Sequence, residues 1–280
     1  MKLLRFSLLA MILAALAACG GTASPAAETG TTPAAGAPAA LKLKVGASPV
    51  PHAEILNYIK DNLAAREGLT LEVVEFTDYV QPNLALSEGQ IDANFFQHVP
   101  YLEQFASDRK LDLASVGAVH IEPLGIYSKK ITALDAVPDG AVVAIPNDPT
   151  NAGRALQLLA ANGLITLKEG VGVDATVQDI ATNPKNLEIS ELEAAQLPRS
   201  LEDTTLSVIN GNYALEIGLK PNKDALALEK AEGNPYANVL AVAKGHEQDP
   251  AVQKLIKLLQ SPEVKQFIET KYEGVVIPAF

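Results

Sequence analysis

The sequence predicts an α/β fold with two lobes and a ligand cleft between them. From residue 41 to the C-terminus, short apolar stretches typical of strands alternate with amphipathic stretches typical of helices, a pattern that favours mainly parallel sheets. Two such blocks follow one another, roughly 41–122 and 123–236, and the last segment, 237–280, returns to the first block. Because open α/β sheets bind ligands beyond the carboxyl ends of their strands, two lobes of this kind suit ligand capture.

The first block contains expected strands separated by helices. Residues 41–46 alternate apolar and polar side chains as a strand does, and the helical stripe of residues 52–66 stops at Gly68. Pro100 suits the first turn of a helix. The other elements expected here are a strand at 69–76, a loop at 77–83 that enters a short helix ending near Gly89, a strand at 91–95, a helix at 99–109 and an extended stretch at 111–127 interrupted by Pro123.

The second block and the C-terminal segment continue the alternation. A buried strand at 141–145 leads through a polar turn into a helix that Asn162 and Gly163 close. The other elements expected here are strands at 187–192, 206–209 and 239–242, a short helix at 224–231, helices at 249–259 and 261–272, and an extended tail at 274–280.

The turn at 146–154 is a candidate anion site. Thr150 or Asn151 is expected to cap the following helix, and Arg154 falls about one turn into it. Free backbone N–H groups, the positive end of the helix dipole and a guanidinium would then lie close together, which suits a carboxylate. The spacing alone equally fits an ordinary strand-to-helix connection with a surface arginine.

Composition and motifs exclude several classes of function. The net charge of −11, with no basic stripe, argues against a nucleic-acid partner. The chain has no P-loop, no dinucleotide glycine fingerprint and no nucleophile-elbow pattern, and its four histidines are scattered. We therefore expect a protein that is not an enzyme, with no catalytic residues, no cofactor and no metal ligands.

The N-terminus has the layout of a processing signal. Lys2 and Arg5 precede an apolar stretch at 6–16, and small residues precede Cys19, the only cysteine. This layout predicts a secretory signal peptide at 1–18, too short to span a membrane, and it resembles the bacterial lipobox, in which the cysteine is lipidated. An ordinary signal peptide with an incidental cysteine is the alternative.

The segment that follows the cysteine is predicted to be a flexible tether. Residues 19–40 contain no large apolar side chain and one charge, so they cannot bury enough surface to offset their ordering entropy. A lipid anchor and a tether would hold the folded part on the extracytoplasmic or periplasmic face of the cell membrane or the outer membrane. The residue after the cysteine is Gly20, not the aspartate associated with inner-membrane retention. The anchor could therefore lie in either membrane.

Polar and aromatic residues recur in loops at the ends of predicted strands. They lie at Tyr79, at 95–101, at 210–213 and at 234–238. Each of them alone fits a structural role: the aromatic rings suit a core, His98 suits a helix cap, and asparagines are common in turns. Only their joint position at the expected cleft favours ligand binding.

Five motifs resemble the methionine-binding lipoprotein family (NlpA lipoproteins), whose members are the substrate receptors of methionine ABC importers. The resemblance runs in order from about residue 42 to the end and implies the type II periplasmic-binding-protein-like fold. The motifs are Asp-Tyr-Val-Gln-Pro-Asn at 78–83, Phe-Phe-Gln-His-Val-Pro-Tyr-Leu at 95–102, Ile-Pro-Asn-Asp-Pro-Thr-Asn at 145–151, Gly-Arg-Ala-Leu at 153–156 and Ile-Pro-Ala-Phe at 277–280.

The resemblance implies a set of ligand contacts. Arg154 would pair with the carboxylate of the amino acid beside Asn151, while Asn212 and Asn238 would help hold the amino and carboxylate groups. Phe95 stands where many relatives have tyrosine, beside the pocket. The residues implied for the side-chain pocket are Tyr79, Phe96, His98 and Tyr101.

The resemblance also implies the partners of the protein. It would bind methionine, with L-methionine favoured over D-methionine or a methionine peptide, by hinge closure as a monomer, and would deliver it to a permease coupled to an ATPase. The alternatives are a receptor for another small ligand on the same fold, such as another amino acid or a metal ion held by His98, His120 and acidic residues, an exported enzyme, or a tethered adhesin.

Overall fold

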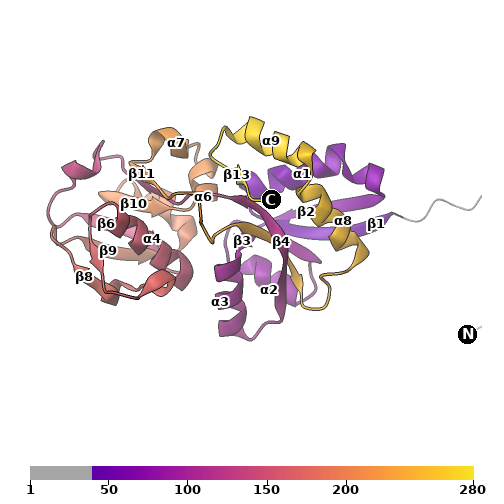
Figure 1. The fold of residues 1–280 in the computed structure, drawn as a ribbon, viewed down its shortest axis with the longest axis horizontal. Helices are drawn as coiled ribbons and strands as arrows, with labels where there is room; N and C mark the ends of the chain where they lie inside the picture. The colour runs from indigo at the N-terminus through magenta and orange to yellow at the C-terminus, as the bar shows by residue number, and fades with distance from the viewer. Residues whose placement is uncertain (1–39) are drawn as a thin grey trace, which may run out of the picture. The chain divides into compact units, whose positions relative to one another are not determined.

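The computed structural model describes residues 40–280 (Figure 1). The predicted signal peptide at 1–18, Cys19 and the predicted tether up to residue 39 lie outside the described residues. Within 40–280, no helix is long and apolar enough to cross a membrane.

A six-stranded sheet is built from the two ends of the described chain, in the order β13-β4-β12-β3-β1-β2 (Figure 1). β1 lies parallel to β2 and β3, whereas β12 lies antiparallel to β3 and β4. The strands are β1 (Leu41–Ala47), β2 (Leu69–Glu75), β3 (Ala93–His98), β4 (Leu113–Ile121), β12 (Asn238–Ala243) and β13 (Ile277–Pro278).

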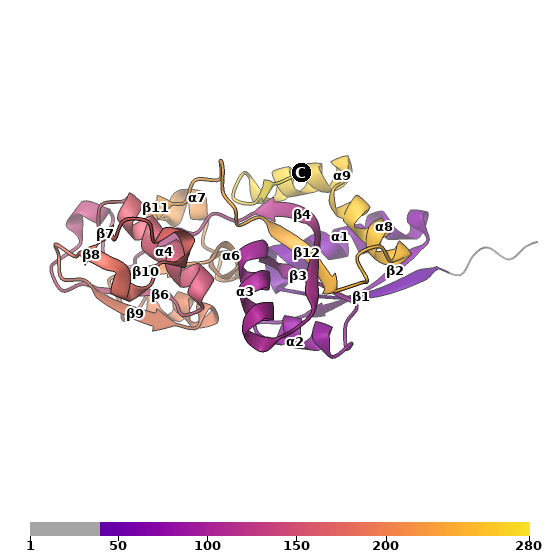
Figure 2. The same cartoon turned by 60° about the horizontal axis from the view of Figure 1, so that its bottom comes forward.

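Helices cover both faces of this sheet (Figures 1 and 2). Alternate residues of β12 separate the two faces: Leu240 and Val242 belong to one core cluster, and Val239 and Ala241 belong to another. The first cluster includes the apolar stripes of α1, α8 and α9, and the second includes Leu102 of α3. The helices are α1 (Glu54–Asn62), α2 (Gln81–Ser87), α3 (Val99–Arg109), α8 (Pro250–Leu259) and α9 (Pro262–Tyr272).

A five-stranded sheet is built from the middle of the chain, in the order β11-β5-β10-β6-β9. β6 lies parallel to β9 and β10, and β5 lies antiparallel to β10 and β11. Its elements are β5 (Gly125–Tyr127), β6 (Val142–Pro146), α4 (Pro149–Ala161), β9 (Glu188–Leu192), α5 (Leu197–Ser200), β10 (Leu206–Ile209), α6 (Gly211–Glu216), α7 (Pro221–Asp224) and β11 (Ala227–Leu228).

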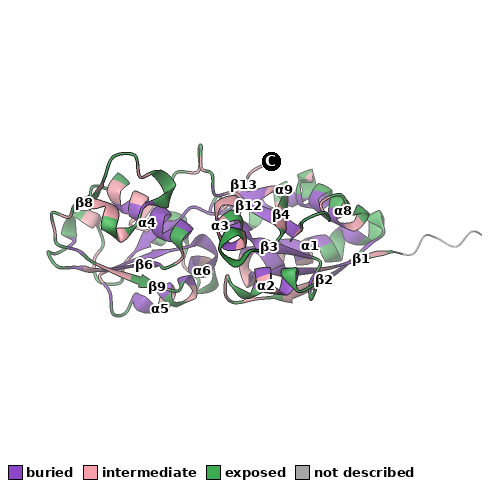
Figure 3. Cartoon of the chain, turned by 90° about the horizontal axis from the view of Figure 1, so that it is seen from below, coloured by how far each residue is buried: buried purple, intermediate pink, exposed green. Residues whose placement is uncertain are grey.

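Short elements complete the fold. β7 (Thr166–Leu167) and β8 (Ile180–Thr182) pair with each other as a separate hairpin, which the sequence analysis did not predict. Both sheets and the inner faces of their helices are buried, and the outer helix faces are exposed (Figure 3). The remaining short segments are an irregular turn at Pro49–Ala53 and 3₁₀ helices at Ala64–Glu67, Leu134–Ala136, Gly172–Asp174, Val177–Asp179 and Ala194–Gln196.

Some sequence expectations are wrong in detail. The sheets are mixed rather than mainly parallel, since β12 and β13 return from the rest of the chain and join the first sheet antiparallel to β4. The helix expected at 224–231 is instead the end of α7 followed by β11. Edge pairing overrides helix propensity there, because the N–H groups of Leu226 and Glu229 donate to the carbonyls of Ile126 and Leu124 at 2.8 and 2.9 Å.

The cap of α4 also differs from the expectation. The N-cap is Asp148 rather than Thr150 or Asn151, and its Oδ1 accepts the backbone N–H of Asn151 at 3.0 Å. Pro149 then occupies the first helical position, where its missing N–H costs nothing. The helix therefore begins two or three residues earlier than expected.

Gly153 allows α4 to lie against the segment that follows β7. A Cβ atom at this position would come within 2.2 Å of the carbonyl oxygen of Val173 and 3.1 Å of that of Ala175. Both contacts are with backbone, which cannot rotate away. The absence of a side chain at Gly153 thus lets α4 pack closely against the backbone of Val173 and Ala175, next to the position of Arg154 in the helix.

We predict that Gly153→Ala lowers the free energy of unfolding. Overpacking of this kind costs about 1–3 kcal/mol, whereas exchanging glycine for alanine inside a helix gains at most about 1 kcal/mol. Urea unfolding of the two proteins measures the difference. Thr270→Ala, on the exposed side of α9, is the matched control and should be neutral or slightly stabilising. Equal or higher stability of Gly153→Ala would show that the segment at Val173 gives way freely.

Candidate functional site

One pocket brings together all eight residues that the sequence analysis assigned to ligand binding. It encloses about 350 Å³ of empty space, part of which is open to solvent. The predicted residues in its lining are Tyr79, Phe96, His98, Tyr101, Asn151, Arg154, Asn212 and Asn238. The lining also contains Gln97, Glu122, Asn210 and Gly211, to which the sequence analysis assigned no role.

Aromatic rings from the first sheet form one wall. Tyr79 follows β2, Phe96 lies in β3, and Tyr101 lies in the first turn of α3. Their ring centroids are 5.8–6.1 Å apart, within the range of favourable edge and tilted contacts. The hydroxyl of Tyr101 donates to the carbonyl of Tyr79 at 2.9 Å. This end of the pocket is therefore apolar, with its hydroxyls directed elsewhere.

His98 stands between this wall and the polar end. It caps α3: its Nδ1 accepts the backbone N–H of Tyr101 at 3.2 Å. The proton of the neutral ring therefore sits on Nε2, which donates to Oδ1 of Asn151 at 3.3 Å. Burial, and secondarily the charge of Arg154, lowers the pKa of His98 to about 3. The imidazole is thus neutral at pH 7.

Arg154, in α4, is a buried cation at the polar end, with only 4% of it exposed. Its Nε donates to Oε1 of Glu229 at 2.9 Å, and its Nη2 donates both to Glu229 and to the carbonyl of Glu122. The guanidinium also lies 4.4 Å from the ring centroid of Tyr236. A guanidinium has five N–H donors, so these bonds leave the two on Nη1 for a ligand.

Glu229 is a functional candidate that the sequence analysis missed. It directly follows β11, in the stretch that was expected to be helical, and its pairing with Arg154 depends on that edge strand. A buried guanidinium without such a partner would be strongly unfavourable. The carboxylate also fixes which edge of Arg154 remains available.

Three asparagines from the second sheet complete the polar end. Asn151 accepts a hydrogen bond from Nδ2 of Asn210 at 2.9 Å, and Asn212 accepts one from the hydroxyl of Tyr79. Two buried atoms have no hydrogen-bond partner within the described chain: the donor Nδ2 of Asn212 and the acceptor Oδ1 of Asn210. Because buried polar groups are rarely left unpaired, the pocket suits a ligand that both accepts and donates hydrogen bonds.

Glu122 is the second candidate that the sequence analysis missed. It directly follows β4, where the chain leaves the first sheet for the second, and it is 6% exposed. Burial raises the pKa of its carboxyl, while His52, Arg154 and the backbone N–H of Asn212 act in the opposite direction. Its position at the boundary between the two predicted blocks was the available sequence signal.

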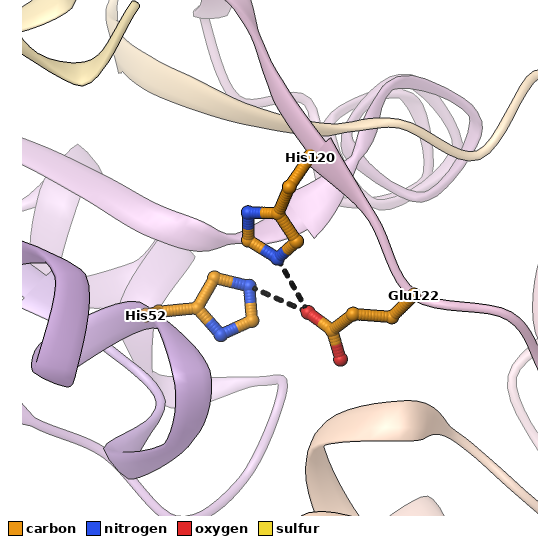
Figure 4. A group of neighbouring side chains, drawn as sticks. All are labelled: His52, His120 and Glu122. Carbon is orange, nitrogen blue, oxygen red and sulfur yellow. Dashed lines mark hydrogen bonds and ion pairs between the residues drawn. The ribbon is translucent and has the colours of Figure 1, made fainter. Parts of the chain in front are cut away.

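The other predicted polar residue, Asn238, begins β12. Its Oδ1 lies 3.0 Å from Nε2 of His52, which in turn lies beside His120 and Glu122 (Figure 4). The predicted alternative was a metal site at His98, His120 and acidic residues. Among the described residues, the group whose ligand atoms lie close enough to hold an ion is His52, His120 and Glu122, which includes His120 and one acidic residue but not His98.

These features define a class of protein before any comparison. Two sheets, each covered by helices, contribute opposite walls to a small buried pocket with one aromatic end and one charged, amide-rich end. This is the architecture of a two-lobed periplasmic-binding fold. A pocket of this kind serves to bind a ligand rather than to transform it.

Comparison with known proteins identifies the family. The profile of the NlpA lipoprotein family matches residues 43–280. The D-methionine-binding lipoprotein MetQ of Escherichia coli K12 is 50% identical over 209 residues, which cover 74% of this chain and 77% of that protein. The chain therefore belongs to the NlpA lipoprotein family, and the predicted resemblance is confirmed.

Solved structures agree with the fold. A nutrient-binding protein from Burkholderia cenocepacia bound to methionine is 49% identical, with a TM-score of 0.82, over 85% of this chain and all of that one. A periplasmic substrate-binding protein of an ABC transporter from Coxiella burnetii is 43% identical, with a TM-score of 0.81 over the same shares. The expected two-lobed fold class is confirmed.

The low pKa of His98 predicts an acid-sensitive fold. Between pH 6.5 and about 3, the unfolded chain binds a proton at this residue that the folded chain does not, so the free energy of unfolding falls as the pH drops through 6.5. We expect His98→Gln to reduce the loss of stability between pH 7.5 and 5.5 by roughly 1 kcal/mol.

Urea unfolding of the ligand-free proteins at the two pH values measures this difference. His246→Gln is the control, because His246 is exposed and its hydrogen bond to Asp249 raises its pKa, so this variant should not flatten the acid side of the profile. An unchanged pH dependence in His98→Gln would mean that His98 is protonated alike in both states.

Proposed function

We propose that this chain is the lipid-anchored extracytoplasmic receptor of an ABC importer, and that it binds methionine in the pocket described above. The observation that carries the proposal is the pairing of opposite charges at one end of the pocket with aromatic rings at the other. The free Nη1 edge of Arg154 suits the α-carboxylate, and the carboxylate of Glu122 suits the α-ammonium group. A zwitterion also meets the unpartnered Nδ2 of Asn212 and Oδ1 of Asn210.

The aromatic wall favours the side chain of methionine. A thioether is polarisable and gains about 0.3–1.5 kcal/mol from each contact with an aromatic edge. Tyr79, Phe96 and Tyr101 present such edges, and the neutral ring of His98 adds a fourth. The names of the relatives, which include a D-methionine-binding lipoprotein and a nutrient-binding protein bound to methionine, support methionine as the ligand without selecting the L enantiomer. L-methionine is the enantiomer that we propose.

We further propose that residues 41–122 with 237–280 form one lobe and residues 123–236 the other. Hydrogen bonds that cross this division would hold the closed form: Tyr79 to Asn212, Tyr213 to the carbonyl of Thr77, and Arg154 to the carbonyl of Glu122. Ligand binding would shift the population toward this form, which the permease and its ATPase would recognise in a monomeric receptor.

Cys19 is the lipidation site in this proposal, with residues 1–18 removed and residues 19–40 as the tether. The anchor would keep the receptor on the extracytoplasmic or periplasmic face of the cell membrane or outer membrane. The relatives are described as lipoproteins, which supports the anchor.

The test is calorimetric titration of ligand-stripped protein with L-methionine and with L-norleucine, in which a methylene replaces the sulfur. We expect saturable binding of L-methionine, weaker binding of norleucine, and a rise in the unfolding temperature with methionine concentration, since a ligand of the folded state stabilises it. If L-methionine produced no heat of binding and no rise in the unfolding temperature, the proposal would be refuted.

Arg154→Ala isolates the carboxylate contact in the same titration. Losing a charge-assisted hydrogen bond costs roughly 1.5–3 kcal/mol, so the affinity should fall at least about tenfold. Arg109→Ala, in α3 and outside the pocket lining, is the matched control and should bind as the wild type does. If Arg154→Ala retained full affinity, the carboxylate would have to bind elsewhere.

A further inference from the structure

Three buried side chains, of which Glu122 lines the pocket, lie close together (Figure 4). His52 lies in the turn Pro49–Ala53, His120 lies in β4, and Glu122 is the residue directly after β4. They are 1%, 0% and 6% exposed. Nε2 of His52 and Nε2 of His120 lie 3.3 and 2.7 Å from the same atom, Oε1 of Glu122. Both imidazoles therefore converge on one carboxylate oxygen.

The surroundings of the two rings fix their tautomers. Nε2 of each histidine faces an oxygen acceptor, and that of His52 also lies 3.0 Å from Oδ1 of Asn238. Nδ1 of His120 has no hydrogen-bond partner among residues 40–280, and Nδ1 of His52 has only the backbone of Val50 near it, without a well-aligned hydrogen bond. With the proton on Nε2, the unpaired atoms are lone pairs. The other tautomer would bury two unpaired N–H groups, which folded proteins rarely do.

The His120–Glu122 pair has the geometry of a hydrogen bond rather than of two metal ligands. Two ligands held about 2.0–2.1 Å from a tetrahedral zinc ion lie roughly 3.3 Å apart, whereas Nε2 of His120 and Oε1 of Glu122 are separated by 2.7 Å, a hydrogen-bond distance. Metal-bound histidines also donate their second N–H to an acceptor, and Nδ1 of His120 has none within the described chain.

We propose that His52 and His120 are positioning residues that hold the Glu122 carboxylate in place, as an anion, to receive the α-ammonium group of the ligand. This inference rests on the proposed function. An unsupported buried carboxylate would take up a proton and lose its attraction for a cation. The N–H of neutral His120 donates to the anion, and the N–H edge of neutral His52, which donates to Asn238, lies 3.3 Å from the same oxygen. Both dipoles stabilise the anion without cancelling its charge, which an arginine or lysine partner would do.

Packing supports this role for both rings. The edge-on ring of Phe95 lies 4.8 Å from the ring centroid of His52 and 5.3 Å from that of His120, so it fixes their orientation. Burial lowers the pKa of His52 to about 4 and that of His120 to about 3, which keeps both rings neutral at pH 7. Arg154, the backbone N–H of Asn212 and the carboxylate of Glu216 are the other groups that act on this site.

Gly211 leaves room for the second oxygen of Glu122. A Cβ atom at Gly211 would lie 2.7 Å from Cβ of Glu122 and 3.1 Å from its Oε2. Oε1 accepts the Nε2–H of His120 at 2.7 Å and lies 3.3 Å from Nε2 of His52, so Oε2 is the oxygen that remains for the ligand. The carboxylate is thus divided between a supporting oxygen and a binding oxygen.

The experiment compares two ligands and paired variants. The ligands are L-methionine and 4-(methylthio)butanoate, which keeps the carboxylate and the thioether but lacks the amino group. His52→Leu and His120→Leu remove the donor. His52→Gln and His120→Gln are the matched controls, because the side-chain N–H of glutamine can reach the position of Nε2. Calorimetry gives the dissociation constant of each ligand for each protein, and thermal unfolding checks that each variant folds.

We expect each leucine variant to weaken L-methionine binding at least about tenfold, the scale of one charge-assisted hydrogen bond, and to leave binding of 4-(methylthio)butanoate unchanged. The glutamine variants should recover most of the preference for the amino acid. A purely structural role would weaken both ligands alike in the leucine variants, and that result would overturn the inference, as would unchanged L-methionine binding.

Two further measurements use the unmodified protein. ¹⁵N chemical shifts of His52 and His120 should report neutral rings protonated on Nε2; rings protonated on Nδ1, or charged rings, would overturn the inference even if no variant folds. Titration with zinc should show no zinc binding at this cluster. Zinc binding to the wild type that is lost in His120→Leu would mean that the cluster is a metal centre. Absence of L-methionine binding to the wild type would refute the proposed function and this inference together, whereas wild-type binding with unaltered variants would refute this inference alone.

Discussion

The pocket depends on the burial of an arginine between the carboxylate of Glu229 and the backbone carbonyl of Glu122. Arg154 is almost fully enclosed, and it can remain charged there because Glu229 pairs with its Nε edge and the carbonyl of Glu122 accepts from Nη2. Desolvating a guanidinium is costly unless its geometry and its partners are good. The chain meets this cost with residues from three places in the fold: α4, the crossing after β4, and the end of β11.

Each half of the pocket is supported by different chemistry. The cationic half uses the Glu229 carboxylate and the face of Tyr236, both of which fix the direction of the guanidinium. The anionic half uses neutral imidazoles, which orient Glu122 while leaving its charge available. The aromatic end needs no charge, and His98 remains neutral between the two ends. An amino acid with an apolar side chain is complementary to this whole arrangement.

Local features of the fold were predictable from the sequence. The bounds of α3 and α8 follow from proline in the first turn, and the structure places them where expected. The motifs also identified eight residues that the structure gathers in one pocket. These signals are local because neighbouring residues determine where helices end and which residues lie in the loops after strands.

The parts that were not predictable depend on contacts between distant residues. Glu229 lies in a stretch with helix-forming residues, and only its pairing with β5 makes it extended and brings it to Arg154. His52 and His120 are separated by a long stretch of chain and meet only because the turn at Pro49–Ala53 and β4 both pack against Phe95 of β3. Residue spacing and hydrophobic periodicity do not indicate such contacts between distant residues.

The most direct test of the central claim is native mass spectrometry of the wild-type protein as purified. A pocket built for a zwitterion with an apolar side chain should retain its ligand, so the spectrum should contain an adduct with the mass of one methionine. The adduct should vanish after unfolding and refolding in ligand-free buffer and return when L-methionine is added. A refolded protein that gains no adduct from L-methionine, or one that retains a metal ion instead, would contradict the account.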